Sequence, residues 1–150
     1  MRIVHSGQVN IFNVEYDHLV FDNRDELYLT RYGRVFTEQL YPENMWTDEN
    51  WVARNAARLS GTSCLYRVRT KEVAGTQADI VLKWNRMGQD IPGAEFDDSL
   101  LSASFNSPFE EFSLVTELRR AGDGRDDRII THKPYAVYVP GNPVALWQSG

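Results

Sequence analysis

The sequence predicts an α+β domain in which an antiparallel β-sheet packs against one helix, preceded by a short β-rich extension and a further helix. Three observations predict this class. Short runs of β-branched and aromatic residues, separated by turn residues, recur along the chain as they do in antiparallel sheets. One segment, residues 107–122, carries helix signals at both ends. The chain has 150 residues, of which 42% are hydrophobic, so it is long enough to form a hydrophobic core.

The first 45 residues are predicted to form the β-rich extension, and residues 46–150 the main domain. In the extension, short β-like runs alternate with turn residues. The predicted strands lie at residues 9–11, 14–16, 19–21 and 27–29, and the predicted turns at Asp22–Asn23 and Tyr32–Gly33.

A helix and a hairpin are predicted to open the main domain. Thr47 is the expected N-cap of the helix, apolar residues recur at helical spacing between Trp51 and Leu59, and Gly61 ends it. Two β-rich runs follow, at residues 64–69 and 80–84, and the polar link between them is typical of an antiparallel hairpin.

The clearest local signal is the start of the second helix, which follows a long predicted loop over residues 86–106. Ser107 can cap this helix, Pro108 occupies its first position, and Glu110 completes a capping box. Gly122 ends it. Its predicted apolar stripe consists of Phe112, Leu114, Val115 and Leu118, and two further strands are expected at residues 129–131 and 135–139.

Composition and charge exclude several classes of function. The net charge of −5 argues against a general surface for nucleic acid or anionic membranes, because such surfaces need clusters of Lys and Arg. The single cysteine, Cys64, excludes an intrachain disulfide and any multi-cysteine zinc site. No run approaches the roughly 20 apolar residues of a membrane-spanning helix, and the first apolar run is too short for a signal peptide. We therefore expect a cytoplasmic protein.

Lys83 is the residue most indicative of function. It lies near the end of the buried-looking run Asp79–Trp84, where an ammonium group needs an anion to replace its lost hydration. A turn-like break, residues 60–63, precedes it, and the helix carrying Glu111 follows it. A lysine suits phosphate oxygens, and a nearby carboxylate both offsets its desolvation and fixes its direction. The order of loop, strand lysine and helix glutamate therefore predicts a phosphate site.

From about residue 59 to 143, this order of elements resembles the N-terminal lobe of the protein-kinase-like fold. Residues 80–83, Ile-Val-Leu-Lys, are similar to the family's Val-Ala-Ile-Lys strand, and residues 65–68 are similar to the strand that leaves its phosphate loop. Residues 111–119 are similar to its helix, with Glu111 at the position that pairs with the lysine.

The resemblance implies a site for ATP with magnesium. Lys83 would contact the phosphates, Glu111 would orient Lys83, and a strand over residues 135–140 would lead into the hinge. The implied nucleotide-binding residues are Ser60, Gly61, Thr62, Ser63 and Leu65, together with Lys83, Val137 and Val139, which with Leu65 would border the base.

The sequence also departs from the family. Of the family's Gly-x-Gly-x-x-Gly only Gly61 is present, and the chain has neither a His-Arg-Asp catalytic loop nor an Asp-Phe-Gly metal site. We therefore expect the nucleotide-binding half of a phosphotransferase, incomplete without a C-terminal lobe that would hold the magnesium, and hence a fragment of a longer chain. The alternatives are a pseudokinase and a non-catalytic module that docks a partner protein. In a non-catalytic module, Lys83 is a surface lysine, and Glu111 is only an acidic residue that interacts favourably with the dipole at the start of a helix.

Overall fold

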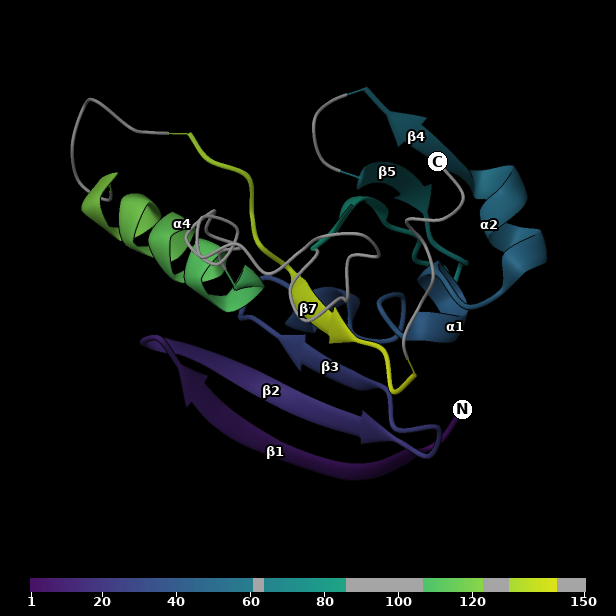
Figure 1. Ribbon diagram of the computed structural model, residues 1–150, viewed down its shortest axis with the longest axis horizontal. Coiled ribbons are helices and arrows are strands. Elements are labelled where there is room, and N and C mark those ends of the chain that lie inside the picture. The colour runs from purple at the N-terminus through teal and green to yellow at the C-terminus, as the bar shows by residue number, and fades with distance from the viewer. Residues whose placement is uncertain (61–63, 86–106, 123–129, 143–150) are drawn as a thin grey trace, which may run out of the picture.

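The computed structural model describes residues 1–60, 64–85, 107–122 and 130–142, and it confirms the predicted α+β class (Figure 1). The described strands form two antiparallel sheets. The four-stranded sheet has the order β1 (Ile3–Ile11), β2 (Val14–Phe21), β3 (Glu26–Leu29) and β7 (Ala136–Val139). The three-stranded sheet has the order β4 (Ala56–Leu59), β5 (Cys64–Arg69) and β6 (Asp79–Trp84). The helical elements are η1 (Arg34–Phe36), α1 (Pro42–Met45), α2 (Glu49–Asn55) and α4 (Pro108–Gly122).

The two parts of the chain that the sequence separates near residue 45 share one sheet. β7 pairs antiparallel with β3, with Leu29 opposite Ala136 and Glu26 opposite Val139. The Thr30 hydroxyl reinforces this junction by donating a hydrogen bond to the Pro134 carbonyl at 2.6 Å. The predicted strand at residues 135–139 is therefore present, but it completes the sheet of the extension and does not join the strand that carries Lys83. Residues 130 and 131 form no strand, and residue 129 lies outside the described residues.

The two faces of the four-stranded sheet are covered by different elements. Side chains alternate between the faces of a strand, so Leu19 and Tyr16 of β2 face opposite ways. Leu19 belongs to a buried core that includes Val68 and Ile80 of the three-stranded sheet. Tyr16 packs instead against Phe109 of α4, with ring centroids 5.5 Å apart. The second sheet and α4 therefore lie on opposite sides of the first sheet.

The helix predicted over residues 51–59 is wrong in its second half. α2 ends at Asn55, and residues 56–59 form β4, paired with β5. The cap is Asp48 rather than Thr47, because the Asp48 carboxylate accepts a hydrogen bond from the Trp51 amide at 3.0 Å. The alanines at the start of β4 suit a helix, but sheet pairing overrides that weak propensity.

α4 begins and ends as predicted, while its buried face differs from the prediction. Glu110 accepts a hydrogen bond from the Ser107 amide at 3.1 Å, which confirms the capping box. Val115 is buried, but Leu114 and Leu118 are 56% and 43% exposed. The helix is rotated so that Phe109 faces the sheet in their place. None of the described helices is both long enough and apolar enough to cross a membrane.

Candidate functional site

The outer face of the three-stranded sheet carries the candidate site. Val68 and Ile80 point into the core, so their strand neighbours point the other way. The strand register sets the outward residues in cross-strand rows: Leu59, Leu65 and Lys83 form one row, and Ala57, Arg67 and Val81 form the next. Strand pairing thus places Lys83 beside β5, the strand that follows residues 60–63 in the sequence.

Lys83 and Glu111 meet as the sequence predicts. The Lys83 ammonium nitrogen lies 2.6 Å from a Glu111 carboxylate oxygen. The Lys83 side chain is exposed and that of Glu111 is half-buried, with 40% and 33% of their surfaces accessible. Glu110 is engaged in the cap of α4, which leaves the next carboxylate free to reach the strand. The pair therefore holds a cation at the edge of the outer face while leaving it open to solvent.

The remaining residues of the predicted nucleotide site do not all come together. Ser60 is exposed directly after β4, whereas Gly61, Thr62 and Ser63 lie outside the described residues. Leu65 is half-buried on β5 beside Lys83. Val137 and Val139, by contrast, lie on β7 in the other sheet.

Val137 is only 5% exposed, and it belongs to the face of the four-stranded sheet that α4 covers. Its side chain therefore packs within the four-stranded sheet and does not lie on the outer face that carries Leu65. Val139 is 39% exposed at the end of the same strand. The structure thus retains the lysine, the glutamate and Leu65 as neighbours on or beside one face, and removes Val137 from the predicted site.

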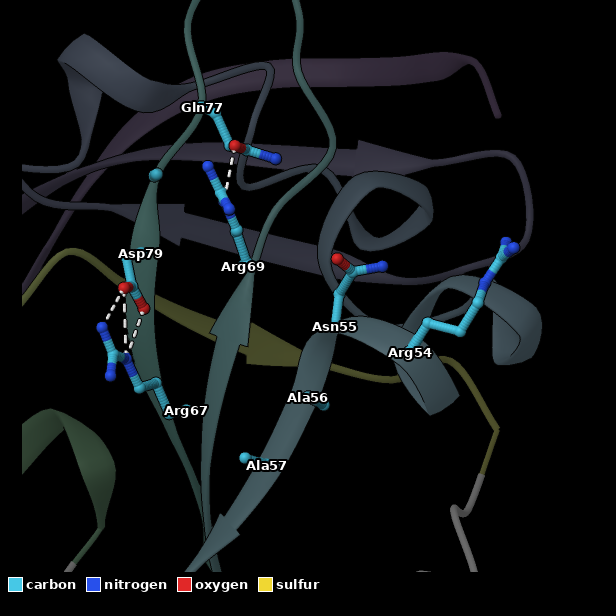
Figure 2. A pocket seen from close by; sticks show the side chains of 9 residues that line it. Arg54, Asn55, Ala56, Ala57, Arg67, Arg69, Gln77 and Asp79 are labelled. Carbon is cyan, nitrogen blue, oxygen red and sulfur yellow. Dashed lines mark hydrogen bonds and ion pairs between the residues drawn. The ribbon is translucent and has the colours of Figure 1, made fainter.

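A pocket of about 520 Å³ lies at the other end of the outer face (Figure 2). Arg67 and Arg69 of β5 line it together with Gln77 and Asp79, and the first residues of β4 close one side. Arg67 donates two hydrogen bonds to Asp79 from one nitrogen, at 3.0 and 3.1 Å. These bonds hold the pKa of the Asp79 carboxyl below its usual range. Arg69 donates to the Gln77 amide oxygen at 2.7 Å.

The pocket carries more positive than negative charge among the described residues. Arg67 is neutralised by Asp79, but Arg69 has only an amide partner. Arg54 also lines the pocket, although Figure 2 shows its guanidinium pointing away from the other arginines. These residues are not among the site residues that the sequence predicts. The available signal was the alternation of Leu65, Arg67 and Arg69, which places two arginines on the same side of a strand as a leucine.

A second polar group lies on the face of the four-stranded sheet that α4 covers. Glu26 accepts a hydrogen bond from the Tyr28 hydroxyl at 2.6 Å, and a ring nitrogen of His18 lies 2.7 Å from the same carboxylate oxygen. The hydrogen bond from Tyr28 and the His18 contact lower the pKa of Glu26 despite partial burial. Burial and the bond to Glu26 raise the pKa of Tyr28 to about 12. His18 is therefore held by Glu26 and by stacking on the Tyr28 ring, with ring centroids 4.3 Å apart.

The described residues do not fit a magnesium site. No group of three or more His, Cys, Asp or Glu side chains within them could hold a metal ion. The carboxylate of Glu111 is already engaged by Lys83. The described part of the chain therefore has a solvent-accessible cation on this face but no cluster of metal-ligating side chains beside it.

No protein-family model matches the chain, and no match was found among the curated proteins or the solved structures compared with it. The function therefore has to be inferred from the geometry of the chain's own residues.

Proposed function

We propose that the chain binds ATP on the outer face of the three-stranded sheet, as the nucleotide-binding half of a protein-kinase-like phosphotransferase. The ion pair between Lys83 and Glu111 is the observation that supports this proposal. It joins a strand lysine to a helix carboxylate 28 residues later in the chain, in the order that the family's phosphate site requires.

The pair suits phosphate binding on physical grounds. Glu111 fixes the direction of a flexible lysine side chain before any ligand binds. The lysine side chain therefore loses less conformational entropy when a phosphate binds. The ammonium group has three donors, and one carboxylate oxygen occupies one of them. The other donors remain for phosphate oxygens, because 40% of the lysine side chain is exposed.

The same face supplies apolar surface for the base. Val81 precedes Lys83 by two residues on β6 and is 62% exposed, and Leu65 lies directly across from Lys83 on β5. A base resting on these side chains would place its phosphates toward the ammonium group. In this arrangement the base contacts Val81 and Leu65 instead of Val137, which is buried in the four-stranded sheet.

The proposal concerns binding of the nucleotide. Phosphoryl transfer in this family needs an aspartate-bearing catalytic loop and a metal-binding aspartate, and the sequence contains neither motif. A pseudokinase role is equally consistent with an intact lysine–glutamate pair.

Titration of the 150-residue chain with Mg-ATP by isothermal calorimetry tests the proposal. Lys83→Met is expected to weaken ATP binding about tenfold or more, since a hydrogen bond to a charged group contributes roughly 1.5–3 kcal/mol. Lys71→Met is the matched control, because Lys71 also pairs with a carboxylate, that of Asp48 at 2.7 Å, but lies away from the outer face. Equal ATP affinity in the wild type and Lys83→Met would contradict the proposal, as would an equal loss in both variants.

A second candidate function, docking of an extended segment of a partner protein, is favoured by β1. Seven of the nine residues of this edge strand are exposed. The strand contains no Lys, Arg, Asp, Glu or Pro to discourage pairing, and no described strand lies on its outer side (Figure 1). An added strand would bind there through main-chain hydrogen bonds. A Ser6→Pro change should abolish such binding and leave ATP binding unaffected.

A further inference from the structure

Two arginines from distant parts of the chain converge on one tyrosine. Arg31 donates a hydrogen bond to the Tyr32 hydroxyl at 2.5 Å, and Arg119 of α4 donates to the same oxygen at 3.3 Å. Both guanidinium groups also lie near the tyrosine ring, with their central carbons 4.7 and 5.2 Å from its centroid. Two cations therefore lie within hydrogen-bonding distance of a single oxygen atom.

These two cations have no carboxylate partner among the described residues. Neither Arg31 nor Arg119 takes part in an ion pair there. Arg34, three residues after Arg31, shows the contrast, because it pairs with both Glu15 and Asp17. The chain as a whole carries a net charge of −5. Like charges held this close repel one another unless an anion lies between them.

The position of Arg119 is fixed by the surrounding structure. Its guanidinium donates to the Thr131 carbonyl at 2.7 Å and to the Thr131 hydroxyl at 3.2 Å. A basic residue in the last turns of a helix also interacts favourably with the helix dipole. The helix dipole explains why a basic residue is favourable at position 119. It does not explain the presence of Arg31, which lies in the segment after β3 and is exposed.

We propose that Arg31, Tyr32 and Arg119 form a binding site for a phosphate group, either free phosphate or a phosphomonoester. The planar guanidinium groups provide paired N–H donors that match phosphate oxygens, and the phenol adds a third donor. A phosphate dianion bridging the two arginines replaces their repulsion with two charge-assisted interactions.

The electrostatics of the phenol agree with this site. Burial raises the pKa of Tyr32, but the hydrogen bonds from Arg31 and Arg119 outweigh that effect and leave the pKa below its usual value. The two guanidinium groups thus favour negative charge at this position, and a phosphate that accepts a hydrogen bond from the neutral phenol would supply that charge. The site shares no residue with the Lys83–Glu111 pair, so it does not depend on the proposed nucleotide binding.

Titration of the full chain with inorganic phosphate tests the site. The readouts are calorimetry and the NMR signals of the arginine Nε–Hε groups, with sodium chloride added to keep the ionic strength constant. Arg31→Gln is expected to raise the dissociation constant for phosphate about tenfold or more. Arg34→Gln is the matched control, because Arg34 is already neutralised by two carboxylates, and it should change the constant less than about twofold.

Three comparisons complete the test. Lys83→Met should retain phosphate binding at this site. This variant therefore distinguishes failure of the phosphate-site proposal from failure of the nucleotide proposal. Phenyl phosphate binding more tightly than inorganic phosphate assigns the site to a monoester, and the reverse order assigns it to free phosphate. Phosphate binding that survives Arg31→Gln unchanged, or signal shifts that chloride reproduces equally well, would overturn the proposal. Because Arg31 is exposed, its replacement should leave the fold intact even if Arg119→Gln does not.

Discussion

Lys83 of β6 and Glu111 of α4 form a 2.6 Å ion pair that connects the three-stranded sheet to the helix packed on the four-stranded sheet. The pair is half-exposed, and the helix is held independently by packing of Phe109 against Tyr16 and Tyr28. The pair is thus poorly placed to stabilise the fold and well placed to hold a cation toward solvent. This distinction can be measured.

Breaking the ion pair should cost little stability. Lys83→Met and Glu111→Gln should each lower the free energy of unfolding by less than about 1 kcal/mol, because half-exposed pairs gain little over water. Urea denaturation of the 150-residue chain measures this. A loss of several kcal/mol in either variant would assign the pair to the architecture and weaken its interpretation as a ligand site.

Removing the hydroxyl of Tyr16 should stabilise the protein. The side chain of Tyr16 is fully buried, and its hydroxyl has no hydrogen-bond partner among the described residues. Burial also raises the pKa of this phenol to about 12. Tyr16→Phe removes an unsatisfied polar group, so the free energy of unfolding should rise by about 1 kcal/mol.

Tyr28→Phe is the matched comparison for Tyr16→Phe. The Tyr28 hydroxyl donates to Glu26 at 2.6 Å, so its loss should lower stability by roughly 1–3 kcal/mol. The two substitutions remove the same atom from neighbouring strands and should have opposite signs in thermal or urea unfolding. Equal effects would mean that the hydroxyl of Tyr16 is satisfied in solution.

Local sequence signals predict the elements whose determinants are close together in the chain. The capping box of α4 needs only Ser107 and Glu110, and the hairpin of β5 and β6 needs only two alternating runs with a polar link. The pairing of β3 with β7 joins residues more than a hundred positions apart. No local pattern specifies it, because any exposed strand edge of suitable polarity is an acceptable partner.

The candidate site residues are likewise predictable from the sequence only where local signals or the order of elements determine their positions. The pairing of Lys83 with Glu111 follows from a resemblance that fixes the order of elements, and the structure contains it. The group at Tyr32 depends on where the end of α4 lies relative to the segment after β3, which the sequence does not reveal. The prediction that Val137 borders the base fails for the same reason, because its strand pairs with β3 in the other sheet.

Gly33→Ala should destabilise the fold by about 2–3 kcal/mol through overpacking. A Cβ at this position would overlap the Tyr135 carbonyl oxygen, which itself accepts a hydrogen bond from the Thr30 amide at 2.9 Å. The backbone φ of Gly33 is −78°, so the expected cost is steric rather than conformational. Gly75→Ala is the comparison: φ is +74°, and apart from its chain neighbours no atom of the described residues lies within 4 Å of the new methyl group. Its cost, about 1 kcal/mol, should be the smaller of the two in urea denaturation.

The stability of the protein should fall in acid partly through Glu26. The hydrogen bond from Tyr28 and the contact with His18 lower the pKa of Glu26 in the folded state. A depressed folded pKa gives stability that is fully present above the unfolded value, about 4.3, and is lost as the pH falls through the folded value. The free energy of unfolding of the wild type should therefore decline as the pH falls below about 5.

Glu26→Gln should make this decline shallower, because it removes the proton uptake that drives it, although the variant starts from a lower stability at neutral pH. Urea denaturation at several pH values between about 3 and 7 gives the slope. Glu72→Gln, which removes one exposed carboxylate from a loop, controls for the change in net charge. If Glu26→Gln and the wild type lose stability in parallel, the hydrogen-bonded group at Glu26 does not contribute to acid sensitivity, and the lowered pKa inferred from its contacts is wrong.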